Sequence, residues 1–276
     1  MIAAVTMVRN DNFFLEKWVD YYSKQFGREN LYIFFDGLDQ TVPSFCHGTN
    51  AVAVEKIGQT VKQNDRLRLD FLSEKAAELF KAGYDIVVGG DADEYLAVDP
   101  DVSPSLADFL SNIKHRKTVS GLGIDVGQKL GKEKPLTLRL PFLSQRRFGR
   151  VSTRYTKASV MFRPLKWGSG FHRVRGTNFH IPDGLYMFHF GFSDNDMIKA
   201  KLLDADRIKS GWEKHLKKRS LTIRLVTERT SVPLDRVARI CRKGQTLFRP
   251  PYAWNKPALL GLRVIVEIPA RFHNLL

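Results

Sequence analysis

The chain has 276 residues, which is enough for one large α/β domain with a tail or for two small domains. Hydrophobic residues make up 43% and charged residues 26%, values that exclude a disordered or low-complexity chain. The formal net charge is +15, and residues 201–276 carry 17 Lys and Arg against 6 Asp and Glu, so the excess lies mainly in the last quarter. A localised basic surface indicates phosphate, nucleic acid or an anionic membrane face, or else a solvated surface without a specific partner.

The N-terminal part begins with a strand and a helix. Residues 2–8 are predicted as a buried strand, because their apolar run has the length of a strand. The run is not typical of a signal peptide, since no basic region precedes it. A helix capped by Asp11 or Asn12 follows and ends at Gly27. Residues 31–35 form the next apolar strand.

Strand and helix patterns continue to alternate along the chain. A short strand at 51–54 precedes a helix over 64–82, and residues 86–88 form a buried strand that runs into two glycines and Asp91. This alternation predicts an α/β fold with a mostly parallel sheet flanked by helices. Ligands bind such sheets at the carboxyl ends of the strands. Three acidic residues are expected at those ends: Asp11, Asp36 and Asp91.

The later part of the chain is less regular. We expect a short helix over 105–113, a strand over 119–125, irregular structure over 126–185, a strand over 185–190 and a basic helix over about 194–218. Two units are therefore predicted, a catalytic domain over 1–205 and a basic, partly helical C-terminal extension over 206–276. Neither Cys46 nor Cys241 belongs to a disulfide or zinc pattern.

The motif D-x-D occurs four times, and its context separates the copies. Asp204 and Asp206 fall within a helical pattern, where positions i and i+2 point apart. Asp194 and Asp196 are typical of a helix N-terminus, and Asp99 and Asp101 flank a proline in a turn. The motif Asp91-Ala92-Asp93 differs, because it directly follows a buried strand and an extended segment places i and i+2 on one face.

Asp91, Asp93 and Glu94 are three acids within four residues at a place where burial is expected. Their mutual repulsion requires a compensating cation, and Mg²⁺ or Mn²⁺ with oxygen ligands fits a site that also receives a diphosphate. A purely structural acidic turn is the alternative.

The sequence resembles bacterial family 2-like glycosyltransferases of the GT-A fold over about residues 1–205. Three segments carry the resemblance, in order and spacing: residues 8–11 before a helix containing Trp18, residues 35–39, and Gly90-Asp91-Ala92-Asp93-Glu94-Tyr95-Leu96. Residues 163–172 and 187–190 resemble two further elements of the family, the second being its histidine segment.

The resemblance implies a metal-dependent glycosyltransferase that uses a nucleotide-sugar donor, with UDP-sugars favoured. It places Asn10, Asp11, Asp36 and Asp39 in the nucleotide pocket and Asp91 near the ribose. It makes Asp93 a metal ligand between the two phosphates and gives His189 a contact with the metal or diphosphate. Asp91, Asp93 and Glu94 are then the catalytic acids. The acceptor is expected to be a glycan, a lipid-linked sugar or a surface polysaccharide.

Sugar transfer also needs a base that takes the proton of the acceptor hydroxyl. Asp125, Asp183 and Asp194 are the candidates, and no motif selects among them. His172 lies in a glycine-rich segment near basic residues, and structural and functional roles are equally favoured for it.

Two other classes of protein are weighed against the glycosyltransferase. A nucleic-acid-binding module would explain the basic charge but leaves the acidic cluster unexplained, and no signature of one is present. A sugar-phosphate nucleotidyltransferase would also use metal and diphosphate, but it usually carries a glycine-rich N-terminal loop that residues 6–12 lack. We expect a cytoplasmic protein without a membrane-spanning helix. The basic run Lys214, Lys217, Lys218 and Arg219, with apolar neighbours that include Ile223 and Leu225, suggests a peripheral contact with an anionic inner membrane surface.

Overall fold

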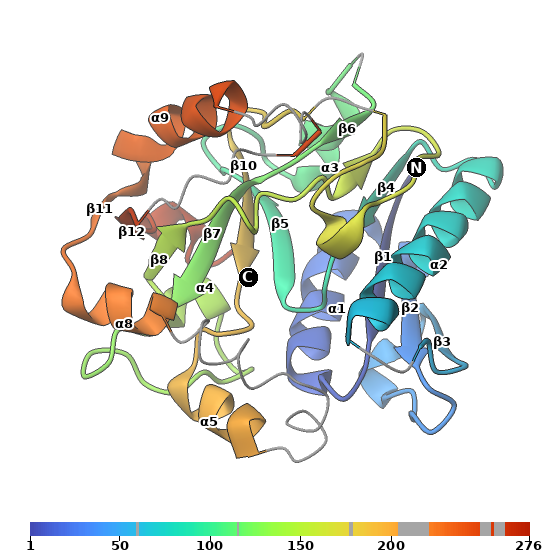
Figure 1. The fold of residues 1–276 in the computed structure, drawn as a ribbon, viewed down its shortest axis with the longest axis horizontal. Helices are drawn as coiled ribbons and strands as arrows, with labels where there is room; N and C mark the ends of the chain where they lie inside the picture. Colours follow the sequence, from blue (N-terminus) through green and yellow to red (C-terminus); the bar gives the residue numbers. More distant parts are fainter. Residues whose placement is uncertain (59–60, 115, 177–178, 204–220, 249–254, 257–262) are drawn as a thin grey trace.

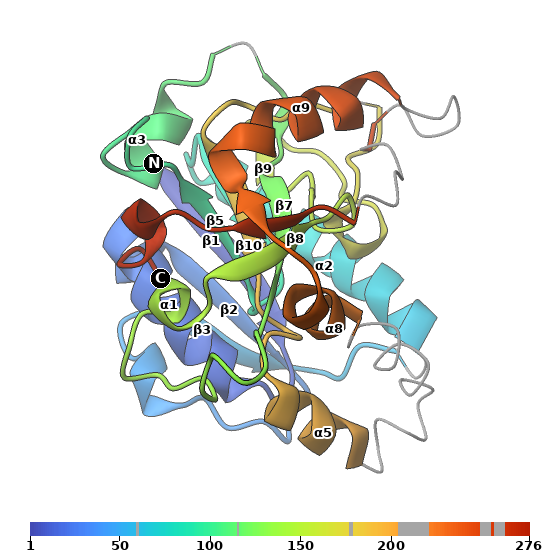
Figure 2. The same ribbon diagram turned by 90° about the vertical axis from the view of Figure 1, so that its left-hand side faces the viewer.

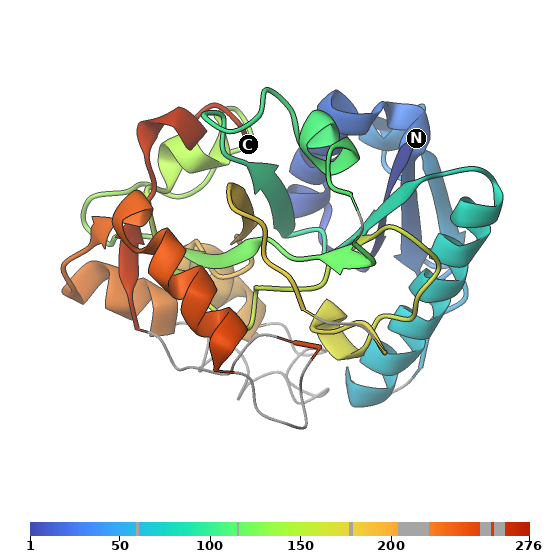
Figure 3. The same cartoon turned by 90° about the horizontal axis from the view of Figure 1, so that it is seen from above.

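The computed structural model describes residues 1–276 except 59–60, 115, 177–178, 204–220, 249–254 and 257–262. The described strands form two sheets that lie beside each other, with the first sheet and α2 on one side and the second sheet with α8 and α9 on the other (Figures 1 and 3). The described helices are α1 (Asn12–Phe26), α2 (Val61–Lys81), α3 (Leu106–Ser111), α4 (Phe142–Gln145), α5 (Asn195–Leu203), α8 (Leu221–Glu228) and α9 (Leu234–Leu247).

The first sheet has the strand order β3-β2-β1-β4-β9-β6. Its strands are β1 (Ile2–Val8), β2 (Leu31–Asp36), β3 (Asn50–Val54), β4 (Ile86–Gly89), β6 (Thr118–Val119) and β9 (Val160–Met161). The pairs from β3 to β4 are parallel, whereas β9 is antiparallel to both of its neighbours. The parallel part confirms the prediction drawn from alternating strands and helices.

Successive residues of β1 point to opposite faces of the first sheet and into different cores. Ala4 and Val8 pack with α1, whereas Ala3 and Val5 pack with α2. The α1 side also includes the apolar face of the second sheet, so one large core joins the two sheets. The two faces therefore explain why β1 is apolar along its whole length.

The second sheet is mixed, with the order β11-β12-β8-β7-β10-β5. Its strands are β5 (Glu94–Val98), β7 (Leu122–Gly127), β8 (Phe148–Val151), β10 (Leu185–His189), β11 (Val232–Pro233) and β12 (Ile265–Glu267). Strand β10 runs parallel to β7 and antiparallel to β5, and β8 is antiparallel to both β7 and β12. The expectation of a mostly parallel sheet is therefore wrong for this half of the molecule.

Helices α3 and α5 lie where helical patterns were expected, and each has a side-chain cap. The Ser105 hydroxyl accepts a hydrogen bond from the Asp108 amide at 3.0 Å, and Asp194 accepts from the amide of Met197. The part of the expected basic helix beyond α5, residues 204–218, lies outside the described residues. No described helix combines the length and the apolar character that crossing a bilayer requires.

Part of the predicted C-terminal extension belongs to the second sheet. Strand β12 pairs with β8, and α8 packs against β7 and β8 (Figure 2). Ile223 and Leu225 are buried, so these two side chains are not available to a membrane surface, contrary to the expectation. The basic run at 214–219 lies outside the described residues. The boundary at residue 205 and the membrane contact stay predictions.

Candidate active site

Three parallel strands of the first sheet end beside one another with acidic residues. Asp36 is the last residue of β2, Asp11 follows β1 and Asp91 follows β4, and these strands are neighbours in the order β2-β1-β4. The expected grouping of acids at the carboxyl edge is therefore present. This edge is where doubly wound sheets bind ligands.

The second sheet contributes a row of charged residues that lie opposite one another across four strands. The register pairs Glu94 of β5 with His189 of β10, His189 with Asp125 of β7, and Asp125 with Arg150 of β8. Directly opposite residues place their side chains on the same face. Since Asp93 immediately precedes β5, the row begins beside the D-x-D motif.

Asp91 is bound by two cations of the chain itself. The Arg68 guanidinium of α2 donates to Oδ1, and Lys157 Nζ lies 2.9 Å from Oδ2. Burial alone would raise the pKa of the Asp91 carboxyl, but the adjacent Arg68 and Lys157 charges hold it well below its usual range. Asp91 is therefore ionised and fixed in orientation.

Glu94 is the most deeply buried acid of the motif, with a side chain only 1% exposed. Its Oε1 lies 2.6 Å from Lys157 Nζ, whereas Oε2 has no hydrogen-bond partner among the described residues. Burial, reinforced by Asp91 and Asp93 against the pull of Lys157, raises the pKa of Glu94 to about 7. A buried carboxylate oxygen without a partner is costly, and it indicates a missing ligand.

His189 connects the D-x-D motif with Asp125. Its Nδ1 lies 2.8 Å from Asp125 Oδ1 and its Nε2 lies 3.5 Å from Asp93 Oδ2, while its ring stacks on Tyr155 with centroids 3.6 Å apart. Burial opposes the charged ring, but the Asp93 charge and the Asp125 hydrogen bond raise the pKa of His189 to about 9. Asp125 also accepts from Thr222 and Arg150, so it fixes the orientation of the ring.

Asp93, Glu94 and His189 offer a possible set of metal ligands. One ligand atom from each lies within 4.8 Å of the other two. Two carboxylates and an imidazole whose second nitrogen meets a carboxylate are typical of divalent-metal sites. The partnerless Glu94 Oε2 fits this use. The predicted set contained Asp91 in place of Glu94, but Arg68 and Lys157 already occupy the Asp91 oxygens.

Gly191 keeps this cluster open. A Cβ atom at that position would lie 2.1 Å from Asp93 Oδ2 and 2.9 Å from His189 Nε2. Any other residue would therefore displace the two groups that face each other.

The residues expected to bind the donor occupy the same edge but already make contacts. Asp36 Oδ1 accepts from the Ile57 amide at 2.7 Å. Asp39 forms a bidentate ion pair with Arg9, at 2.9 and 2.7 Å, and this hydrogen bonding lowers the pKa of Asp39 to about 2. Asn10 has a left-handed backbone with φ of 52°, between β1 and α1. The nucleotide pocket stays a prediction for all of these residues.

The three candidates for the base have different surroundings. Asp194 is buried, pairs with buried Arg146 at 3.0 Å and accepts three backbone amides, so it is a structural cap of α5. Asp183 is exposed, pairs with Arg242 at 2.8 Å and lies at the opposite end of β10 from His189. Only Asp125 belongs to the charged row, where it contacts His189.

Nothing in the sequence marks two cations of the site, Lys157 and Arg68, as functional residues. Lys157 lies three residues before β9, in a segment rich in Ser and Thr, and Arg68 lies on α2 one turn beyond Asp65. A single Lys or Arg in either setting is indistinguishable from a solvated residue such as Arg66, whose side chain is 83% exposed. Only the packing of α2 and of the 152–160 segment against the acids reveals them.

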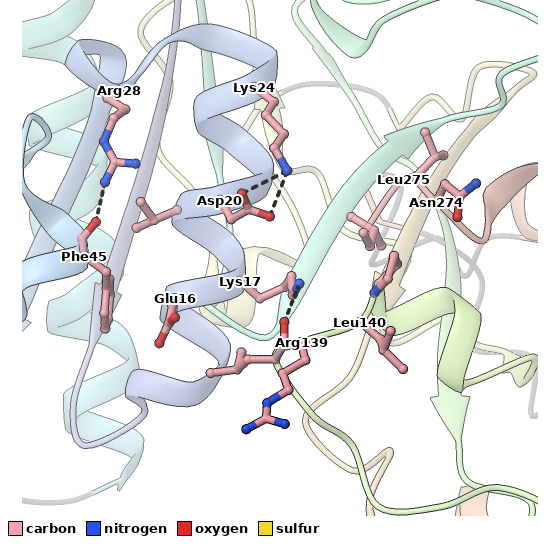
Figure 4. Close-up of a pocket in the computed structure, with 14 residues that line it drawn as sticks. Glu16, Lys17, Asp20, Lys24, Arg28, Phe45, Arg139, Leu140, Asn274 and Leu275 are labelled. Carbon is pink, nitrogen blue, oxygen red and sulfur yellow. Dashed lines mark hydrogen bonds and ion pairs between the residues drawn. The ribbon is translucent and has the colours of Figure 1, made fainter.

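A cavity of about 510 Å³ lies apart from these acids, along the outer side of α1 (Figure 4). It lies between α1, the segment 138–141 and residues 274–276, and it shares no residue with the acidic site. Lys24 and Asp20 pair with each other there, and Lys17 donates to the Leu138 carbonyl at 3.3 Å. The cavity is therefore not part of the chemistry described above.

No protein-family model matches the chain, and no curated protein matches it. Among solved structures, the chain is similar to a glucose-1-phosphate thymidylyltransferase from Bacillus anthracis in complex with a sucrose, with 11% identity and a TM-score of 0.28 over 80% of this chain and 84% of that one. It is also similar to a mannose-1-phosphate geranyltransferase from Thermus thermophilus, with 11% identity and a TM-score of 0.28 over 97% of this chain and 73% of that one. Likeness at this level carries no argument about activity.

Proposed function

We propose that the protein is a glycosyltransferase that moves a sugar from a nucleotide-sugar donor to a glycan, lipid-linked or surface-polysaccharide acceptor. The observation that carries the proposal is the meeting of Asp93, Glu94 and His189 where the second sheet adjoins Asp91 at the carboxyl edge of the parallel strands, with Glu94 Oε2 buried and without a partner among the described residues. Asp11, Asp36 and Asp91 follow three neighbouring strands at this edge, which is where such sheets bind ligands, and a metal ion beside them would offset the charge of a diphosphate-linked donor.

Asp93, Glu94 and His189 would hold a Mn²⁺ or Mg²⁺ ion, which when bound offsets negative charge on the departing diphosphate. The chain's own residues prepare that site. Asp125 orients His189 by accepting from Nδ1, which leaves Nε2 directed at Asp93. Arg68 and Lys157 compensate Asp91, and Lys157 also binds Glu94 Oε1, so Glu94 Oε2 is left for the metal.

In the transfer, the bond between the anomeric carbon and the diphosphate oxygen breaks, and the acceptor oxygen bonds to that carbon. The acceptor proton passes to a base. Of the three residues considered for this role, Asp125 alone belongs to the site, and its contacts with His189, Arg150 and Thr222 favour an orienting role. A nucleotidyltransferase would break a different bond and release pyrophosphate from a nucleoside triphosphate.

The released product therefore distinguishes the two reactions. The full chain is incubated with Mn²⁺ and UDP-, GDP- or dTDP-sugars, and release of the nucleoside diphosphate is measured, with or without added acceptors. A second series supplies nucleoside triphosphates and sugar 1-phosphates, and pyrophosphate is measured. We expect nucleoside diphosphate from at least one donor and no pyrophosphate. Pyrophosphate alone would establish the nucleotidyltransferase instead.

Asp93→Asn tests whether the proposed metal site supports that activity. The substitution keeps the volume and removes the charge, and we expect activity to fall at least about 100-fold, the cost typical of losing one charge-stabilising group. Asp101→Asn is the matched control, because the Asp101 side chain is 73% exposed in a turn away from the motif. Equal activity of the two variants would contradict the assignment of Asp93.

A further inference from the structure

Three cations gather around His172, which is also near Asp91, and we call this group the cationic flank: Arg154, Arg173 and Lys256. Arg154 belongs to the connection between β8 and β9, which also supplies Tyr155 against His189 and Lys157 against Asp91. Arg154 is therefore one residue from the ring that stacks on His189 and three residues from the cation that binds Asp91.

Arg173 and Lys256 reach the same place from other parts of the chain. The segment around Arg173 folds back on itself, since Trp167 bridges to Val174 and the Gly168 amide donates to the Arg173 carbonyl at 2.8 Å. Asn255 donates from its side chain to the Val174 carbonyl at 2.8 Å, which brings Lys256 beside Arg173. Burial, and next the Arg173 charge, lower the pKa of Lys256, as expected for neighbouring cations.

His172 lies near both the cationic flank and Asp91. Its ring is half-buried, and its electrostatic neighbours include Lys157, Arg154, Lys256 and Asp91. Burial first, and then these cations, lower the pKa of His172 to about 3, so the imidazole is neutral at physiological pH. A neutral ring offers one N–H donor at this point without adding another charge.

Within the described part of the chain, no carboxylate forms an ion pair with Arg154, Arg173 or Lys256. Other arginines of the molecule do pair, as Arg9 does with Asp39 and Arg271 does with Asp99. Cations that lie close together without a counter-ion repel one another, and a bound anion adds attractive interactions that offset this repulsion.

We propose that the cationic flank, together with His172, binds a phosphoryl group of a substrate next to Asp91. Arginine suits this role because its planar donors match phosphate oxygens in pairs. The inference deepens the proposed function, on which it rests for the identity of the substrate. The phosphoryl group belongs either to the diphosphate of the donor or to a phosphorylated acceptor.

The test is the binding of inorganic pyrophosphate to the full chain, measured by calorimetry with EDTA present so that no divalent cation takes part. The variant Arg154→Gln/Arg173→Gln removes two charges from the cationic flank. Arg139→Gln/Arg236→Gln removes two exposed charges elsewhere and is the matched control. We expect saturable binding in the wild type, a dissociation constant about tenfold or more higher in the first variant, and no change in the control.

Absence of saturable binding, or equal loss in both double variants, would overturn the proposal. Arg154→Lys/Arg173→Lys guards against unfolding, since it keeps the charge and should restore most of the affinity. Competition with UDP identifies the source: displacement of pyrophosphate assigns the donor diphosphate, and simultaneous binding assigns an acceptor phosphoryl group. Because EDTA removes the metal, this result is independent of sugar transfer, and Asp93→Asn should still bind pyrophosphate if the proposed activity fails.

Discussion

Thr222 donates a hydrogen bond to Asp125, although 97 positions separate the two residues in the sequence. The Thr222 side chain is fully buried on α8, and Asp125 in turn binds Nδ1 of His189. Thr222 belongs to the predicted C-terminal extension, and it contacts Asp125, which orients the candidate metal ligand His189. The extension is expected to affect the site through this contact.

Thr222→Val should weaken Mn²⁺ binding about threefold to tenfold. The substitution removes the hydroxyl but keeps the shape, so Asp125 loses one of the hydrogen bonds that fix its orientation. Loss of a residue that directly supports a metal ligand costs about 10- to 100-fold in affinity, and Thr222 acts one contact further away. Calorimetric titration with Mn²⁺ measures the effect. Thr227→Val on the same helix is the control, because Thr227 bonds the Leu130 amide instead. Equal affinity of the two variants would show that Thr222 has no influence on the site.

The roles of the two acids that flank Asp93 should separate. Glu94→Gln should lower the affinity for Mn²⁺ at least about tenfold, because Glu94 Oε2 has no described partner and is available to a metal. Asp91→Asn should change metal affinity less, because both Asp91 oxygens contact Arg68 and Lys157. Titration of each variant with Mn²⁺, without nucleotide, gives the comparison. A larger loss in Asp91→Asn would restore the metal set expected from the sequence.

The sequence predicts the acids of the site better than it predicts their partners. Asp11, Asp36 and Asp91 could be placed at one edge because each follows an apolar run of strand length, and parallel strands end together. The approach of Glu94, His189 and Asp125 depends on the register of β5, β10 and β7, which is fixed by tertiary packing. The second sheet escaped prediction for a similar reason, since β8 is only four residues long within an irregular stretch.

Asp194→Ala should lower the free energy of unfolding by about 3–5 kcal/mol, the range typical of breaking a buried ion pair from one side. The change leaves Arg146, which is completely buried, without its carboxylate, and it removes the acceptor of three amides. Urea denaturation measures the loss, and Asp196→Ala is the control because its exposed pair with Lys199 contributes little. Turnover per folded molecule should be unchanged. A lost turnover with unchanged stability would instead return Asp194 to consideration as the base.

Lys157→Met should destabilise the protein by about 3–5 kcal/mol, because it removes the Lys157 ion pair from the buried Glu94 carboxylate and one of the two ion pairs of Asp91. Glu94→Gln alone should cost less, since Lys157 still pairs with Asp91 at 2.9 Å. If Lys157 stabilises the fold mainly by compensating Glu94, the double variant Lys157→Met/Glu94→Gln should lose less free energy of unfolding than the two single variants lose together. The expected coupling is about 1–3 kcal/mol.

Urea denaturation of the wild type, both single variants and the double variant completes the cycle, with Mn²⁺ removed so that metal binding does not add to stability. Additive losses would mean that Lys157 serves Asp91 alone, and that the low exposure of Glu94 is compensated by other groups.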